Sequence, residues 1–101
     1  MENSNKECIK RPTYADIIRE CISEASLYEQ LAEECSELAQ ACIKKSRKLR
    51  GENYTPKTNE EIDRNIREEF TDIILVSDVL RLHSDADLYY KKLRRWVDRN
   101  V

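Results

Sequence analysis

The sequence predicts an all-α protein. Its 101 residues include one glycine and two prolines, and β-branched runs are few. Apolar residues recur every three to four positions over most of the chain, which is typical of helices with one buried face. A chain of this length forms one domain with a thin core, so we expect a helical hairpin with flanking helices that associates with a second copy.

The first half of the chain predicts two helices. We expect a flexible N-terminus over residues 1–12 and a single domain over residues 13–101. Thr13 is placed to cap a helix that continues to about residue 24. A second helix should run from about residue 26 to residue 49, where basic side chains complement the helix dipole and Gly51 provides a stop. No glycine or proline divides these two helices, so they could be separate or continuous.

The second half predicts a loop and two more helices. Residues 51–59 contain Pro56 and several polar residues, a composition typical of turns. Thr58 or Asn59 can cap the third helix, and Glu61 completes a capping box if Thr58 is the cap. This helix should reach residue 82 or 83. The polar residues that follow break the pattern and can cap a fourth helix over residues 86–99.

Two pairs of acidic residues lie in the two long helices. Glu34 and Glu37 belong to the stretch LAEECSEL, and Glu69 and Asp72 belong to REEFTDII. Each pair is spaced three residues apart, so both carboxylates project from one side of a helix. At about 100° per residue, the first member of each pair falls inside the apolar stripe and the second falls at its edge. We therefore expect the four carboxylates to reach a shared ion.

An acid on a buried stripe requires a partner. An ionised carboxylate buried alone costs several kcal/mol, and neither stripe has a lysine or arginine at the same level. The remaining partners are a metal ion or a proton held at a raised pKa. Oxygen donors without histidine or cysteine favour Mg²⁺ or Mn²⁺ over zinc, and Mg²⁺ typically works with substrate phosphates. The alternative is that all four acids are ordinary solvated side chains.

Charge and composition argue against several other classes of protein. The net charge of −2 gives no case for stable nucleic-acid binding. No run approaches the roughly 20 apolar residues of a membrane span, and the N-terminus lacks the apolar core of a signal peptide, so we expect a cytoplasmic protein without membrane contact. The four cysteines show no CxxC spacing, and neither a zinc site nor disulfides are expected.

Around the acids the sequence resembles the MazG-like branch of the all-α nucleoside triphosphate pyrophosphatases. That family carries an EExxE motif on one helix and an ExxD motif on the next. The motifs are matched here by Glu33-Glu34-x-x-Glu37 and by Glu69-x-x-Asp72. The likeness extends to the basic, aromatic tail YYKKLRRWVDRN, although the interval between the two motifs is long for the family. The resemblance implies a homodimer or homotetramer built from four-helix bundles, each completed by oligomerisation.

The resemblance also implies a reaction. A nucleoside triphosphate would be hydrolysed between its α and β phosphates to a monophosphate and pyrophosphate, with Mg²⁺ held by the four acids. Metal ions can neutralise and orient a triphosphate and lower the pKa of a bound water. Glu33 and Glu68 each precede a metal ligand, where one of them could orient or deprotonate that water. Their alternative role is solvent-facing helix charge.

Basic and aromatic residues of the chain are the candidate contacts to the phosphates and the base of a substrate. Family members carry basic residues late in the chain that reach the phosphates, so we favour Lys91 and Arg95, which share a helix face. For each basic residue the alternative is complementation of the helix dipole. The candidate phosphate contacts are Lys44, Lys45, Lys91, Arg95 and Arg99, and the aromatic residues that could stack on a base are Tyr14, Tyr28, Tyr54 and Trp96.

Two other functions remain open from the sequence. The chain could be a non-catalytic relative that binds nucleotide or only oligomerises, although the presence of all four acids argues against this. It could also be a helical adaptor whose basic last helix binds an acidic partner or nucleic acid.

Overall fold

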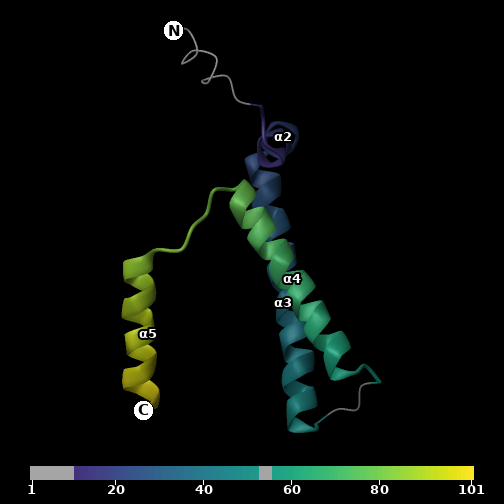
Figure 1. Cartoon of the computed structure of the whole chain (residues 1–101), viewed down its shortest axis with the longest axis vertical. Coiled ribbons are helices and arrows are strands. Elements are labelled where there is room, and N and C mark those ends of the chain that lie inside the picture. The colour runs from purple at the N-terminus through teal and green to yellow at the C-terminus, as the bar shows by residue number, and fades with distance from the viewer. Residues whose placement is uncertain (1–10, 53–55) are drawn as a thin grey trace.

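The fold is all-α, as predicted. The computed structural model describes residues 11–52 and 56–101, and all regular structure in them is helical (Figure 1). The expected flexible N-terminus lies almost wholly outside the described residues, as does Tyr54. No helix in the described ranges is long and apolar enough to cross a membrane. The helices are α2 (Tyr14–Cys21), α3 (Glu24–Arg50), α4 (Asn59–Val79) and α5 (Ala86–Asn100).

The first two helices are separate. The hydroxyl of Thr13 accepts a hydrogen bond from the N–H of Asp16, and the Asp16 carboxylate accepts one from the N–H of Thr13, which forms a capping box at the start of α2. Ile22 is extended and ends this helix. Helix α3 begins earlier than expected because Ser23 is its N-cap, with its hydroxyl accepting from the N–H of Ser26.

The loop between α3 and α4 is bounded as predicted. Gly51 has φ of 66°, and its N–H donates to the carbonyls of Arg47 and Lys48, which closes the end of α3. At the start of α4, Thr58 and Glu61 form the expected capping box, with bonds of 3.0 and 3.1 Å. Local signals are therefore sufficient to set both ends of this loop.

The prediction for the end of α4 was wrong, because the helix stops at Val79. Arg81 takes a left-handed conformation with φ of 60°, a position that usually belongs to glycine. The N–H groups of Arg81 and Leu82 donate back to the carbonyls of Asp78 and Ser77. The turn is an ordinary helix C-terminus, but without a glycine the sequence carries no signal for it.

The core lies between α3 and α4, which run side by side in opposite directions (Figure 1). An ion pair of 2.8 Å joins Lys45 Nζ on α3 to Asp63 Oδ1 on α4. At the other end, Arg19 of α2 donates a 2.9 Å hydrogen bond to the carbonyl of Val79. The expected helical hairpin is therefore present. Its buried apolar residues are Leu27, Ala41, Ile62, Val76 and Val79.

Helix α5 stands apart from the hairpin at the end of an extended segment (Figure 1). Its packing on the other helices is slight beside that of α3 on α4. Its apolar side chains are exposed, and Trp96 has 67% of its surface accessible. Within the described residues, one chain therefore forms a hairpin with two appended helices, and completion of a four-helix bundle by a second copy stays a prediction.

Candidate metal centre

Three of the predicted acids meet between the two long helices. Glu34, Glu37 and Glu69 each offer a carboxylate oxygen within 4.8 Å of the other two. Glu34 is buried, with 8% of its surface exposed, and the other two are half-buried. Glu34 and Glu37 lie one turn apart on α3 and face Glu69 on α4. We call these three residues the acidic triad.

Asp72 lies at the edge of the acidic triad. Its side chain is exposed, and it is not among the oxygens that come within 4.8 Å of one another. Its carboxyl group is nevertheless within hydrogen-bonding reach of Glu34. The structure thus places Asp72 beside the group, on the side open to solvent.

The crowding of these carboxylates raises two pKa values. Burial raises the pKa of Glu34 most, and a side-chain hydrogen bond with Asp72 and the negative charges of Asp72 and Glu37 raise it further. The pKa of Glu69 is raised first by its hydrogen bond with Glu37, then by burial and by the neighbouring acids. Gln30 opposes this trend at Glu34, where its Nε2 donates a 3.1 Å hydrogen bond to Oε1. Without a cation, Glu34 and Glu69 therefore retain their protons to a higher pH than ordinary glutamates do.

One oxygen of the acidic triad lacks a partner. Oε2 of Glu69 is buried and forms no hydrogen bond within the described part of the chain. A buried polar atom without a partner is costly, and native structures usually provide one. A divalent cation would satisfy this oxygen and offset the repulsion between the three acids. The all-oxygen donor set fits Mg²⁺ or Mn²⁺.

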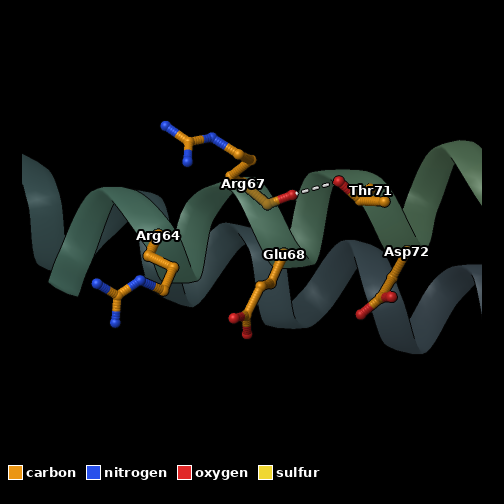
Figure 2. A pocket seen from close by; sticks show the side chains of 5 residues that line it. All are labelled: Arg64, Arg67, Glu68, Thr71 and Asp72. Atoms are coloured by element: carbon orange, nitrogen blue, oxygen red, sulfur yellow. Dashed lines mark hydrogen bonds between the residues drawn. The ribbon is translucent and has the colours of Figure 1, made fainter. Parts of the chain in front are cut away.

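The two predicted catalytic glutamates lie outside the acidic triad. Glu33 is exposed on α3, and Glu68 is exposed on α4. Figure 2 shows Glu68 on the same side of α4 as Asp72. Glu68 is therefore close to the open side of the acids.

The predicted phosphate contacts on α3 are not beside the acidic triad. Lys45 lies eleven residues after Glu34, which is about 16 Å along the helix axis, and its Nζ already pairs with Asp63. Lys44 is exposed one residue nearer. Neither lysine reaches the acids from its position on α3.

The other predicted substrate contacts are also distant from the acids within one chain. Lys91, Arg95, Trp96 and Arg99 belong to α5, which stands away from the hairpin (Figure 1). Tyr14 is 88% exposed on α2, and Tyr28 on α3 is 48% exposed. The structure therefore does not bring the proposed phosphate-binding helix to the acids of its own chain.

A hollow next to Asp72 was not predicted from the sequence. It has a volume of about 430 Å³ and lies along the outer side of α4 (Figure 2). The four-residue spacing of Arg64, Glu68 and Asp72 was the available signal, since side chains at that spacing share one helix face. Its lining consists of Arg64, Arg67, Glu68, Thr71 and Asp72.

Comparison of the chain with protein-family models, curated proteins and solved structures gives no match. The motif resemblance stays a prediction.

Proposed function

We propose that this protein is a Mg²⁺-dependent nucleoside triphosphate pyrophosphohydrolase that releases a monophosphate and pyrophosphate, with Mn²⁺ as an alternative ion. The observation that carries the proposal is the acidic triad: each residue offers a carboxylate oxygen within 4.8 Å of the other two, and Oε2 of Glu69 is buried without a partner in the described residues. Buried acids without a cation are unfavourable, so the arrangement is explained best by a bound ion.

The residues of the site would divide the work. Glu34, Glu37 and Glu69 would hold the ion from the buried side, and Asp72 would close the ligand set from the open side. When bound, the ion would neutralise phosphate charge and lower the pKa of a coordinated water. Glu68 is exposed beside Asp72, so it is placed to accept the proton of a water that attacks from solvent. Glu33, which is exposed on α3, is the alternative residue to accept that proton.

Association with a second copy is part of the proposal. The apolar face of α5 is exposed, and its basic residues lie far from the acids of the same chain. In a homodimer or homotetramer, α5 of one copy would cover its apolar face against another copy and bring Lys91, Arg95 and Arg99 toward phosphates at that copy's acids. We place this activity in the cytoplasm, where it would act on the nucleotide pool.

The test is a panel of nucleoside triphosphates incubated with the full chain and Mg²⁺. Wild type should release pyrophosphate, and Glu34→Gln and Asp72→Asn should lose this release. Glu29→Gln is the matched control, because Glu29 is exposed on the same helix five residues away. Release of orthophosphate would show cleavage of a different bond and would contradict the proposal, as would equal activity in Glu34→Gln.

A non-catalytic helical adaptor is the second candidate, and the exposed α5 favours it. Its apolar and basic side chains could bind an acidic protein or nucleic acid. Binding that weakens steeply with salt and does not change with Mg²⁺ would support this function. Mg²⁺ binding that depends on Glu69 but is accompanied by no turnover would instead indicate a nucleotide-binding protein without catalysis.

A further inference from the structure

The hollow on α4 combines positive charge with one of the site acids. Arg64, Glu68 and Asp72 follow one another at intervals of four residues, so each is displaced by about 40° from the last around the helix. Figure 2 shows Arg64 and Glu68 on the same side of α4, with Asp72 one turn further on, whereas Arg67 projects to the opposite side. Arg64 therefore occupies one end of a row whose other end reaches the acidic triad.

Arg64 is available to bind a ligand. Its side chain is exposed, and within the described residues it forms no hydrogen bond or ion pair, while its charge helps to lower the pKa of Glu61, one turn earlier on α4. The adjacent Glu68 does not satisfy it, and an arginine four residues before a glutamate is the less favourable order for a helix ion pair. Thr71 is already engaged, since its hydroxyl donates a 2.7 Å hydrogen bond to the carbonyl of Arg67. The guanidinium of Arg64 is thus a donor group at the end of the hollow nearest the start of α4, and Arg67 supplies a second guanidinium to the lining.

We propose that Arg64 binds the phosphate at the end of a polyphosphate chain whose other phosphates contact the metal at the acidic triad. This inference rests on the proposed function and adds a substrate contact from the same chain as the metal ligands. Arg64 precedes Glu69 by five residues, which is about 7.5 Å along α4 and about 140° around it, so a polyphosphate would leave the ion on the open side, where Asp72 lies, and follow the row past Glu68 toward the guanidinium. A planar guanidinium can donate two parallel hydrogen bonds to one phosphate.

The charges in the hollow make this binding dependent on metal. Glu68 and Asp72 line the same space as Arg64 and repel a bare phosphate. A divalent ion at the acidic triad would neutralise the acids nearest to it, after which the positive charge of Arg64 can act. Arg64 should therefore bind polyphosphate in the presence of Mg²⁺ and not in its absence.

The test is calorimetric titration of the full chain with inorganic tripolyphosphate, with and without Mg²⁺. Wild type should bind only with Mg²⁺, and Arg64→Gln should weaken this binding about tenfold to a hundredfold, which is the usual effect of losing hydrogen bonds to a charged group. Arg64→Lys should recover part of the loss, because it keeps the charge but not the paired donors. Arg47→Gln is the matched control, since it removes the same charge from an exposed side chain near the end of α3 that does not line the hollow.

The outcomes separate this inference from the proposed function. Equal weakening in Arg64→Gln and Arg47→Gln would overturn the inference, because it would indicate a general effect of net charge. Unchanged binding in Arg64→Gln, with Mg²⁺ binding and pyrophosphate release intact, would overturn the inference alone. Wild type that binds no Mg²⁺, or binds no tripolyphosphate with Mg²⁺ present, would overturn both.

Discussion

The substitution Glu69→Gln should have opposite effects on stability with and without Mg²⁺. In the metal-free protein at neutral pH, Glu69 lies among other carboxylates, and its Oε2 is buried without a partner. A glutamine removes one negative charge and provides an amide that can donate to Glu37. Glu69→Gln should therefore stabilise the metal-free protein. With Mg²⁺ present, the same substitution removes a ligand and should abolish the stabilisation that the ion gives wild type.

The pH dependence follows from the two raised pKa values. Because the pKa values of Glu34 and Glu69 lie above the ordinary value of 4.5, the folded state binds more protons than the unfolded state over the interval between them. The contribution of these groups to metal-free stability is therefore greatest below about pH 4.5 and is lost as pH rises through their folded pKa values. Glu69→Gln should flatten this decline.

The size of the metal effect follows from linkage. A ligand that binds only the folded state, at a free concentration 100 times its dissociation constant, stabilises by about 2.7 kcal/mol. For a chain of 101 residues this corresponds to a rise of roughly 10–20 °C in the thermal midpoint. The assay is thermal unfolding followed by circular dichroism, in EDTA and in excess Mg²⁺, at matched ionic strength. Glu29→Gln should behave as wild type.

Two results would refute this reasoning. A Mg²⁺-induced rise of equal size in wild type and Glu69→Gln would show that the ion acts elsewhere, for example by general screening. Destabilisation of the metal-free protein by Glu69→Gln would show that this carboxylate is satisfied without a cation, and the acidic triad would then be an ordinary part of the core.

Three further predictions concern the fold. Arg81→Gly should stabilise by about 0.5–1 kcal/mol and Gly51→Ala should destabilise by about 1 kcal/mol in urea unfolding, because both positions have left-handed backbone; a loss of stability in the first would contradict this. Arg19→Gln should cost about 1–2 kcal/mol in the same assay, since it removes the donor to the last carbonyl of α4, and no change would show that water replaces it. Trp96→Glu should reduce association in sedimentation, if α5 packs on a second copy through its apolar face; unchanged association would exclude this face.

Helix ends were predictable where a residue signals them locally. Thr13, Thr58 and Gly51 act through bonds to residues three or four positions away, so their effect is contained in a short stretch of sequence. The end of α4 was missed because Arg81 takes the conformation that the sequence rules assign to glycine. Its position depends on tertiary contacts, including the bond from Arg19 to Val79.

The candidate site, like the helix ends, was predictable where a local pattern of residues determines it. The angular positions of Glu34 and Glu69 on their helices follow from the helical repeat, and both acids lie between the helices in the structure. Gln30 and Arg64 were missed because an isolated glutamine or arginine on a charged helix resembles any solvated side chain. The location of α5 could not be predicted, since it depends on packing between elements and no local signal specifies it.

The arrangement of the core suggests how metal binding and hairpin stability are coupled. The buried apolar residues lie on both sides of the acids: Leu27 and Ala41 are seven residues before and after Glu34 on α3, and Ile62 and Val76 are seven residues before and after Glu69 on α4. Each buried aliphatic side chain contributes about 1.5–3 kcal/mol. The middle is occupied by the acids, which repel one another when ionised. Apolar contacts on both sides of the acids thus hold together a centre that is unfavourable without a cation.

This distribution makes a regional prediction for amide hydrogen exchange. Addition of Mg²⁺ should slow exchange most around Glu37 and Glu69, because the ion joins α3 to α4 at that level and suppresses local opening. Amides near Leu27 and Ile62 should change less, since apolar contacts already protect them. Uniform slowing along both helices would show that the ion stabilises only the global fold, and the centre would then not be a separate weak region of the hairpin.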